Sequence, residues 1–407
     1  MSSSWINLHS LSQALQTQIP HLSSNNILSY ESKEKKSDGN HYSSHITTIK
    51  VSFKATTADQ PKRINLFTKT VIDSAFGQML AKTGILAKEK LMYSSILPEI
   101  NALLKDDSVS PISYGTPKEG TIILEDLSEE GYVLINRIEQ LDYLKTIKVL
   151  TKLAKLHAAS VAVHKKIPSL VEEAGTDIGL SEKYRNEFIT FLENALETVA
   201  DRLDTWTEIK DHKRYAASIR NVKRTLWTCL KEAREHHPHE LRVLNHNDLW
   251  LSNIMFKFNS DSTIQDVKFV DFQLCTLASP VIDLHQFLTA NVQFQVFVNQ
   301  LDELLAEYLK VLNKYLEKFE TGFSLTNEQL KSAYEKKQIL GFYAGIVTLI
   351  PVLADPQRPS DFSESSSKEM AEVSLFDRLV DSKYYREALP KYLKYFEERG
   401  ILVLERE

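Results

Sequence analysis

The chain has 407 residues, 43% of them hydrophobic, and a formal net charge of −5. This length favours two domains or lobes over one small domain, and it suffices to bury a large core without disulfide bonds. Because 49 basic residues face 54 acidic ones, the composition argues against a basic nucleic-acid binder, and two cysteines cannot form a disulfide framework.

The cysteine content and the first residues bear on localisation. Two cysteines favour a reducing compartment. Met1 to Asn7 has neither a basic start nor an apolar run, so it does not predict a secretory signal. The most apolar stretch, Phe342 to Ala354, contains Pro351 and is shorter than the roughly 20 residues of a membrane helix. We therefore expect a cytoplasmic monomer that does not enter a membrane, with Phe342 to Ala354 as a buried helix.

The first third of the chain is predicted to form a small sheet with one helix. Four short runs rich in β-branched and aromatic residues have the composition of strands, namely Ile46–Phe53, Ile64–Val71, Pro111–Tyr114 and Thr121–Leu124. Between the second and third runs, Thr83 to Leu97 predicts a helix that Pro98 ends.

The rest of the chain is predicted to be mainly helical. Gln140 to Val163 and Ser181 to Lys231 have apolar residues at helical spacing, and helices resume from Ile282. The irregular segment Asp355 to Lys368 interrupts them and is expected to be a surface loop. A strand-rich island lies between the helices, with the runs Leu241–Leu244, Ile254–Phe258 and Val267–Val270.

These elements predict an α+β fold of two parts. The N-terminal part, residues 1–126, is a small β-rich domain with one helix. The C-terminal part, residues 127–407, is a large and mostly helical domain that contains the strand-rich island.

The densest polar cluster lies in the strand-rich island. His246, Asp248 and Asn253 form the pattern H-x-D-x-x-x-x-N, and Asp271 ends an apolar strand 18 residues further on. Phosphoryl transfer needs these groups, because one carboxylate orients the acceptor hydroxyl and takes its proton while a second carboxylate and an amide hold Mg²⁺. The pattern predicts Asp248 as the base and Asn253 and Asp271 as the metal ligands.

A lysine and a glutamate in the N-terminal part fit the same chemistry. A kinase needs a lysine for the phosphates, held by a glutamate of the following helix. Lys69 lies in the second predicted strand, and Glu89 lies 20 residues later in an apolar stripe of its helix. Because a glutamate in such a stripe is rarely buried unless it is paired, we expect Glu89 to pair with Lys69. The alternative is a solvent-facing Lys69, with Lys50 and Lys54 as rivals.

Several common phosphate-binding signatures are missing. The 12 glycines include no G-x-G-x-x-G and no G-x-x-x-x-G-K, which excludes a standard P-loop. Gly39 precedes the first predicted strand with hydroxyls nearby, and such a turn either covers phosphates or is an ordinary hairpin turn. Asn247 stands where protein kinases carry arginine, Gln273 replaces the D-F-G glycine, and no A-P-E follows. A small-molecule acceptor is therefore favoured over a protein.

Each of these residues also has a plain structural interpretation. Aspartate and asparagine in loops commonly stabilise turns, and a buried, hydrogen-bonded strut is the favoured role of His246. A metal-dependent hydrolase that uses His246, Asp248 and His285 is disfavoured, because it needs more ligands and leaves Asn253 without a role. A non-catalytic binding protein is a further alternative, against which the complete set of catalytic residue types argues.

The sequence resembles the ecdysteroid kinase-like (CHK kinase-like) family of insects, within the wider choline kinase and aminoglycoside phosphotransferase group. The resemblance covers about residues 37 to 355. It is carried by Gly39-Asn-His-Tyr-Ser-Ser44, Leu66-Phe-Thr-Lys69, Glu89-Lys-Leu-Met-Tyr93, Leu124-Glu-Asp-Leu127, Leu153-Ala-Lys-Leu-His-Ala158, Leu244-Asn-His-Asn-Asp-Leu-Trp-Leu-Ser-Asn253, Phe269-Val-Asp-Phe-Gln273 and Pro280-Val-Ile-Asp-Leu284.

This resemblance implies a bilobal protein-kinase-like fold that binds ATP between its lobes. Residues 1–126 would bind the nucleotide phosphates, and residues 127–407 would hold the catalytic loop, the metal site and the acceptor pocket. It implies Asp248 as the catalytic base and Asn253 and Asp271 as Mg²⁺ ligands. It also implies that Lys69 and Glu89 serve the phosphates of ATP.

The resemblance implies further roles around the nucleotide and the catalytic loop. The glycine turn with Gly39, Ser43 and Ser44 would cover the phosphates, although Asn40 and His41 depart from the family's usual Gly-acid-Asn pattern. The segment from Leu124 to Leu127, with Glu125 and Leu127 as its binding residues, would form the hinge that bonds adenine through the backbone. The supporting residues would be His246, Asp283 and His157.

The acceptor is expected to be a small hydroxylated molecule. The resemblance implies an ecdysteroid or a xenobiotic that is detoxified by phosphorylation. The alternatives are a kinase of another small alcohol such as choline, and a non-catalytic nucleotide-binding protein on the same fold. Gly341 to Leu353 is a candidate lining for an apolar acceptor pocket, but plain helical core is the favoured interpretation.

Overall fold

The computed structural model describes residues 5–35, 44–56, 59–71, 83–236, 240–355 and 375–403. The chain divides into two compact units. The smaller unit comprises the chain up to residue 134 together with residues 255–273, and the larger unit contains residues 135–254 and most of the chain from residue 274 onwards. These units are discontinuous in sequence, whereas the predicted domains, 1–126 and 127–407, are continuous. The predicted domain limits therefore remain a prediction.

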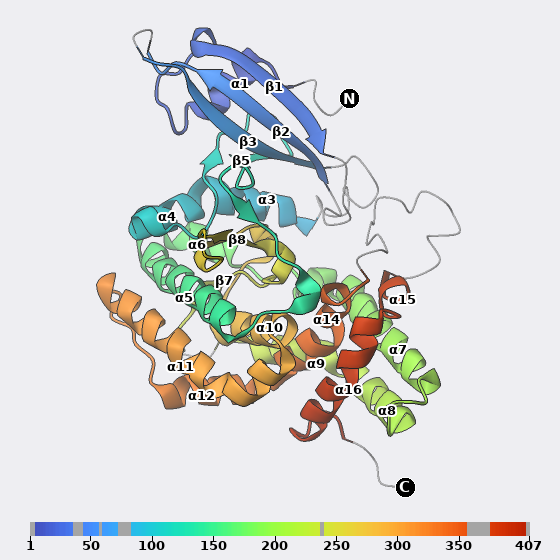
Figure 1. The fold of residues 1–407 in the computed structure, drawn as a ribbon. Helices are drawn as coiled ribbons and strands as arrows, with labels where there is room; N and C mark the ends of the chain where they lie inside the picture. The colour runs from blue at the N-terminus through green and yellow to red at the C-terminus, as the bar shows by residue number, and fades with distance from the viewer. Residues whose placement is uncertain are drawn as a thin grey trace. The chain divides into compact units, whose positions relative to one another are not determined.

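The smaller unit is built on a five-stranded antiparallel sheet in the order β1-β2-β3-β5-β4 (Figure 1). Its strands are β1 (Ile27–Lys35), β2 (Ser44–Phe53), β3 (Lys62–Val71), β4 (Ser113–Tyr114) and β5 (Thr121–Glu125). The four strands predicted from the sequence are present, while β1 was not predicted. Every residue of β1 after Ile27 is exposed, so this strand has no alternating apolar pattern by which to recognise it.

The helix α1 (Leu8–Leu15) covers one face of this sheet, and the side chain of Lys69 lies on the opposite face. Leu11 and Leu15 of α1 pack in one cluster with Ile49 and Leu66 of β2 and β3. Since side chains alternate along a strand, Leu66 and Lys69 point to opposite faces. The strand register therefore aims Lys69 away from α1.

The predicted helix from Thr83 to Leu97 is longer and less regular than expected. It consists of α3 (Ile85–Leu91), a π-helical turn over Met92–Ile96, and α4 (Leu97–Leu104). The prediction that Pro98 ends the helix is wrong. Pro98 lies in the first turn of α4, where a missing N–H group costs little, so the helical path continues past it.

The second sheet of the smaller unit is a three-stranded sheet in the order β6-β8-β9. Its strands are β6 (Tyr132–Val133), β8 (Ile254–Phe258) and β9 (Ile264–Phe269). The predicted hairpin tip between β8 and β9 is present, because the N–H of Asn259 donates to the carbonyl of Thr263 over 2.9 Å. This hairpin leads the chain directly to Asp271.

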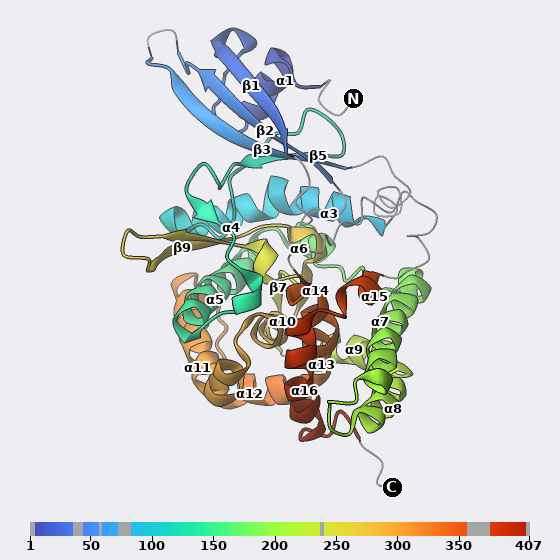
Figure 2. The ribbon, with the colours of Figure 1, turned by 45° about the vertical axis from the view of Figure 1, so that its right-hand side comes forward.

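The larger unit is mainly helical, with one short ribbon of β7 (Val243–Asn245) and β10 (Thr276–Ala278). The long helices α5 and α11 pack along each other, as do α7 and α8 (Figure 2). The helices are α5 (Tyr143–Lys166), α6 (Pro168–Ala174), α7 (Arg185–Thr205), α8 (His212–Lys223), α9 (Leu226–Arg234), α10 (Val281–Asn291), α11 (Phe294–Lys318), α12 (Asn327–Lys336), α13 (Gln338–Tyr343), α14 (Leu349–Val352), α15 (Leu375–Leu379) and α16 (Lys383–Glu397).

The helix α10 forms the centre of the larger unit. All of its residues except Gln286 are buried, including Asp283, His285 and Asn291. A helix that is buried all round lies inside a core rather than on its surface. Polar side chains on such a helix need partners within the protein. Those of Asp283 and Asn291 have them on the loop that follows β7.

The apolar segment Phe342 to Ala354 is helical and mostly buried, as predicted. A π-helical turn over Ala344–Thr348 joins α13 to α14. Among the described residues, no helix is both long enough and apolar enough to span a membrane. The predicted surface loop, Asp355 to Lys368, lies outside the described residues except for Asp355.

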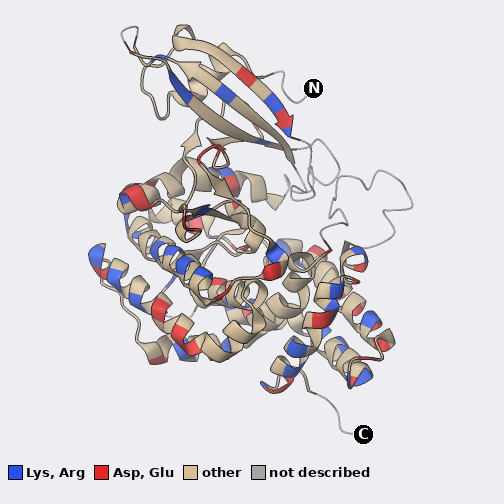
Figure 3. Ribbon diagram, viewed as in Figure 1, with Lys and Arg blue, Asp and Glu red and all other residues tan. Residues whose placement is uncertain are grey.

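Basic and acidic residues are interspersed along the outer helices of the larger unit (Figure 3). Arg220 of α8 pairs with Glu197 and Asp201 of α7 at 2.7 Å each. Arg202 of α7 pairs with Asp381 at 2.8 Å. These half-exposed pairs fix neighbouring helices, but each contributes at most about 1 kcal/mol.

Candidate active site

The first group of candidate residues lies in the smaller unit and centres on Lys69. The register places Lys69 between Ile46 of β2 and Ile122 of β5, both of which are buried. The Nζ atom of Lys69 lies 2.9 and 3.0 Å from the two carboxylate oxygens of Glu89. It also lies 2.7 Å from Oδ1 of Asp271. The expected ion pair of Lys69 with Glu89 is therefore present, and Asp271 is its third member.

This triad is largely withdrawn from solvent. The exposed fractions of the side chains are 16% for Lys69, 2% for Glu89 and 28% for Asp271. The rival lysine of the sheet, Lys50, is 56% exposed and pairs with Glu129 instead. A buried glutamate on α3 thus selects Lys69 among the lysines of the sheet.

Burial and mutual charge shift the pKa values of the triad in definite directions. Burial alone lowers the pKa of Lys69, but the charges of Asp271 and Glu89 outweigh it and hold that pKa above its usual value. Burial raises the pKa of Glu89 to about 7; the charge of Lys69 opposes this rise, and that of Asp271 adds to it. One ammonium faces two carboxyl groups, so the fully ionised triad carries an excess negative charge that suits a cation.

The backbone holds Asp271 in an unusual conformation at the end of the β8–β9 hairpin. Its φ is +67°, a region that non-glycine residues rarely adopt. Its N–H donates to the hydroxyl of Tyr93 over 3.1 Å, and the ring of Tyr93 meets the buried ring of Phe272 edge-on at 5.9 Å. Gln273, which replaces the D-F-G glycine, donates to Oδ2 of Asp271 over 3.3 Å. These contacts fix the carboxylate that Lys69 binds.

The second group of candidate residues lies in the larger unit, on the loop that follows β7. The side-chain amide of Asn253 donates to the carbonyl of Asp248 over 2.8 Å and to its carboxylate over 3.1 Å. Asn253 is 6% exposed and ends a 3₁₀ turn over Leu251–Asn253. Because its nitrogen makes both bonds, its side-chain oxygen is the atom suited to a cation.

Asp283 of α10 holds this loop from beneath. Its carboxylate is fully buried and accepts the backbone N–H groups of His246 and Asn247, each over 2.7 Å. It also accepts Nε2–H of His157 over 3.1 Å. The other ring nitrogen of His157 lies 2.7 Å from the hydroxyl of Tyr308. The chain Tyr308–His157–Asp283 thus fixes the backbone immediately before Asp248.

Two further loop supports were not predicted from the sequence. Asn291, at the end of α10, accepts the N–H of Leu251 over 2.9 Å and donates to the carbonyl of Leu249 over 3.0 Å. Asn245 donates to carbonyls of the β10 strand and accepts the N–H of Asp283 over 3.3 Å. The polar residues of an otherwise apolar helix were the available signal for Asn291, as they were for Asp283.

His246 and His285 are both buried, with exposed fractions of 0% and 2%. The supporting role of His246 remains a prediction. The ring of His285 stacks on Tyr334 with 3.7 Å between centroids, and its Nε2–H donates to the carbonyl of Tyr334 over 2.9 Å. Among the described residues, no three histidine, cysteine or acidic side chains form a metal cluster. The hydrolase alternative therefore has no ligand set there.

The segment that was predicted to be the hinge makes hydrogen bonds to neighbouring parts of the smaller unit. The N–H of Glu125 donates to the carbonyl of Ile112 over 2.8 Å, and its carboxylate lies 3.4 Å from Nζ of Lys268. The carbonyl of Leu127 accepts the N–H of Tyr132 over 2.9 Å, and the Leu127 side chain is buried. Adenine binding by this segment remains a prediction.

The glycine turn is not part of the described structure. Gly39 and Ser43, with the departing residues Asn40 and His41, lie outside the described residues. Ser44 is the first residue of β2, and its side chain also lies outside the description. The prediction that this turn covers phosphates therefore stays a prediction.

Tyr343 is an additional residue of interest near Asp248. It is the last residue of α13 and is half-buried, whereas its neighbours Phe342 and Ala344 are fully buried. Burial raises the pKa of Tyr343; the charge of Arg234 opposes this rise, and that of Asp248 adds to it. Most of the candidate pocket lining from Gly341 to Leu353 is core, as favoured, and Tyr343 is an exception that senses Asp248.

Comparison with known proteins identifies the family. A profile of the ecdysteroid kinase-like family matches residues 38–321. The chain belongs to this family. Together with the small β-rich and the larger helical unit, this membership confirms the predicted α+β, protein-kinase-like fold class and assigns the protein to the kinase-like phosphotransferases.

Two solved structures are similar to this family member over nearly its whole length. A mutant of aminoglycoside 2′-phosphotransferase IIIa in complex with GDP is 15% identical, with 97% of each chain covered and a TM-score of 0.38. A choline/ethanolamine kinase family protein from Mesorhizobium loti is 13% identical, with 95% of this chain and 100% of that chain covered and a TM-score of 0.33. No curated protein sequence matches the chain. Neither structure is close enough to assign a substrate.

Proposed function

We propose that this protein transfers the γ-phosphate of ATP to a hydroxyl group of a small molecule. The observation that carries the proposal is the buried triad, in which Glu89 and Asp271 hold the ammonium of Lys69 within 3.0 Å. A buried ammonium that is paired on two sides is positioned for phosphate oxygens, and the excess negative charge suits a magnesium ion.

The donor set fits Mg²⁺ rather than a metal held wholly by protein. Asn253 offers an amide oxygen and Asp271 a carboxylate, which are the hard oxygen ligands that Mg²⁺ prefers. Since Mg²⁺ keeps several waters and binds phosphates, two protein ligands suffice, in keeping with the lack of a larger cluster among the described residues. Bound Mg²⁺·ATP supplies the phosphoryl group and neutralises charge on it.

The residues of the chain then have distinct roles. Asp248 orients the acceptor hydroxyl and takes its proton. Lys69 binds phosphate oxygens, and Glu89 keeps its side chain extended toward them. Asp283 holds the backbone before Asp248 through two 2.7 Å bonds, so that the base does not need to reorganise during the reaction.

The acceptor is proposed to be an ecdysteroid or a hydroxylated xenobiotic. Burial raises the pKa of the half-buried Tyr343 and the charge of Asp248 adds to this rise, so we include the aromatic ring of Tyr343 in the proposed acceptor site. Most of the apolar segment from Gly341 to Leu353 is core, and Thr348 and Pro351 are its other half-buried residues.

The test is phosphate transfer by the purified full-length chain. The protein is incubated with Mg²⁺·ATP and a panel of hydroxylated acceptors that includes ecdysone, 20-hydroxyecdysone and choline, with Asp248→Asn as the control. We expect a phosphorylated steroid that is absent with the control variant. Transfer only to choline would support kinase activity but contradict a steroid acceptor. Nucleotide binding without any transfer would favour the non-catalytic alternative.

A further inference from the structure

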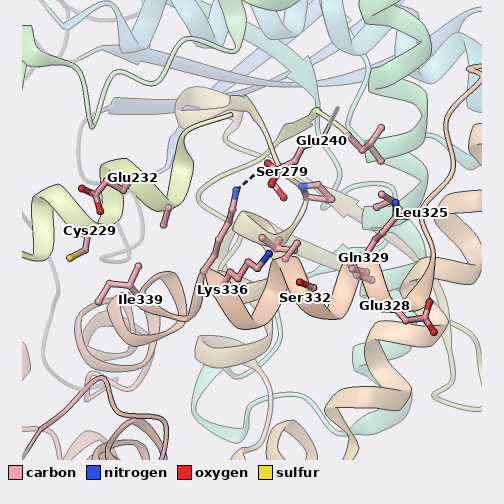
Figure 4. A pocket seen from close by; sticks show the side chains of 17 residues that line it. Cys229, Glu232, Glu240, Ser279, Leu325, Glu328, Gln329, Ser332, Lys336 and Ile339 are labelled. Atoms are coloured by element: carbon pink, nitrogen blue, oxygen red, sulfur yellow. Dashed lines mark hydrogen bonds and ion pairs between the residues drawn. The ribbon is translucent and has the colours of Figure 1, made fainter. Parts of the chain in front are cut away.

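The larger unit contains a pocket of about 720 Å³ that none of the candidate active-site residues lines (Figure 4). Its walls come from the end of α9, from α12 and the start of α13, and from the segments 240–241 and 279–281. These two segments flank the ribbon of β7 and β10. Pockets of this size commonly hold small molecules.

The pocket has an apolar floor and a charged rim. Leu241, Val281 and Leu330 line it and are at most 4% exposed. At the rim, Glu328 and Lys336 are exposed. A ligand with an apolar body therefore gains from burial against the floor.

One buried ion pair gives this pocket its polar character. The Lys337 side chain is 7% exposed, and its Nζ lies 3.3 Å from Oε2 of Glu240, whose side chain is 29% exposed (Figure 4). An ammonium has three N–H donors, and within the described part of the chain Glu240 is the one hydrogen-bond partner of the Lys337 ammonium. Such unfilled donors at a pocket wall favour a ligand oxygen.

The charges of the lining restrict the ligand class. Three glutamates, Glu232, Glu240 and Glu328, face two lysines around the pocket. An anion drawn to Lys337 meets the carboxylate of Glu240 within a few ångströms, and a cation drawn to Glu240 meets the ammonium. A hydroxyl avoids both penalties, because its oxygen accepts from Lys337 while its hydrogen is donated to Glu240.

We propose that this pocket binds a neutral, largely apolar molecule through one hydroxyl group that bridges Lys337 and Glu240. The site is distinct from the acceptor site proposed above. Leu241 precedes β7 and Asp248 follows it, so the pocket and the catalytic base lie beyond opposite ends of this strand. The proposal does not depend on kinase activity, and its test measures binding alone.

The test uses three naphthalene probes with the full-length chain in isothermal titration calorimetry. 2-Naphthol is neutral at pH 7 and both donates and accepts, 2-methoxynaphthalene only accepts, and 2-naphthoate is an anion. We expect saturable one-to-one binding of 2-naphthol and about tenfold weaker binding of each of the other two, the size of one lost hydrogen bond to a charged group. Equal affinity for 2-methoxynaphthalene, tighter binding of 2-naphthoate, or no binding of 2-naphthol would overturn the proposal.

Variants locate the binding in the pocket. Lys337→Met should weaken 2-naphthol about tenfold, whereas Lys336→Met, its neighbour at the exposed rim, should leave the affinity within about twofold. Ala333→Phe keeps the ion pair and fills the pocket from α12, so it should abolish binding even if Lys337→Met does not fold. An equal loss in the two lysine variants, or binding that survives Ala333→Phe, would place the probe elsewhere.

Discussion

Replacing Asp283 by asparagine should destabilise the larger unit by about 3 kcal/mol. The buried carboxylate accepts one N–H at Oδ1, from Asn247, and two at Oδ2, from His246 and His157. An asparagine has only one oxygen, so in either orientation its NH₂ group faces at least one buried donor. At least one bond to a charged acceptor is lost, at about 1.5–3 kcal/mol, and the remaining ones become neutral and weaker.

Urea unfolding followed by tryptophan fluorescence measures this loss. Trp206, Trp227 and Trp250 all belong to the larger unit, so the signal mainly reports that unit. The matched control is Tyr308→Phe, which removes one neutral hydrogen bond to His157 and should cost about 1 kcal/mol. If Asp283→Asn costs less than this control, the carboxylate does not carry the loop and the reasoning is refuted.

Three further outcomes are expected. Lys69→Met should lower phosphate transfer on the order of 100-fold, while the exposed Lys50→Met should leave it unchanged; equal losses in a transfer assay would contradict the role of Lys69. Burial lowers the pKa of His285 to about 3. The neutral, buried ring therefore contributes its full stabilisation of the fold above the usual histidine pKa of 6.5, and this stabilisation is lost as the pH falls toward 3. Between pH 7 and pH 5 the natural chain should lose about 2 kcal/mol more unfolding free energy than His285→Gln, and equal losses would rule out a buried neutral ring. Gly345→Ala should cost about 1–3 kcal/mol in urea unfolding because its Cβ would lie 2.9 Å from the buried Tyr392 ring, and no change in stability would show that the core yields there.

The elements with a strong apolar pattern were predictable from the sequence. The strands β2, β3 and β5 and the helix α5 alternate or repeat as their class requires, and they lie close to the predicted limits. β1 escaped prediction because its side chains are exposed on both faces. The prediction that Pro98 ends the helix failed because a π-helical turn precedes this residue. Pro98 therefore lies in the first turn of α4, where a helix tolerates a proline ring.

The candidate site was predictable where a polar residue contradicts an apolar pattern. Glu89 in a helical stripe requires a partner, and it has one in the structure. The role of Asp283 was expected only from the family resemblance, and its hydrogen bonds to the loop are present. The bonds of Tyr308 to His157 and of Asn291 to Leu251 could not be predicted, since they depend on how α11 and α10 pack against distant segments. The pocket around Lys337 could not be predicted from the sequence either, because four separate stretches of the chain form its lining.

The large sequence separation within the triad delays its assembly while the chain is being synthesised. Lys69 and Asp271 are 202 residues apart, and the smaller unit is completed only by residues 255–273. At 5–20 residues per second, a ribosome needs about 10–40 s to add that length. During this time the five-stranded sheet, whose last strand in sequence ends at Glu125, is already synthesised, while β8, β9 and Asp271 are still missing. Of the triad, only Lys69 and Glu89 then exist. A fragment that ends before residue 255 would remain permanently in that state.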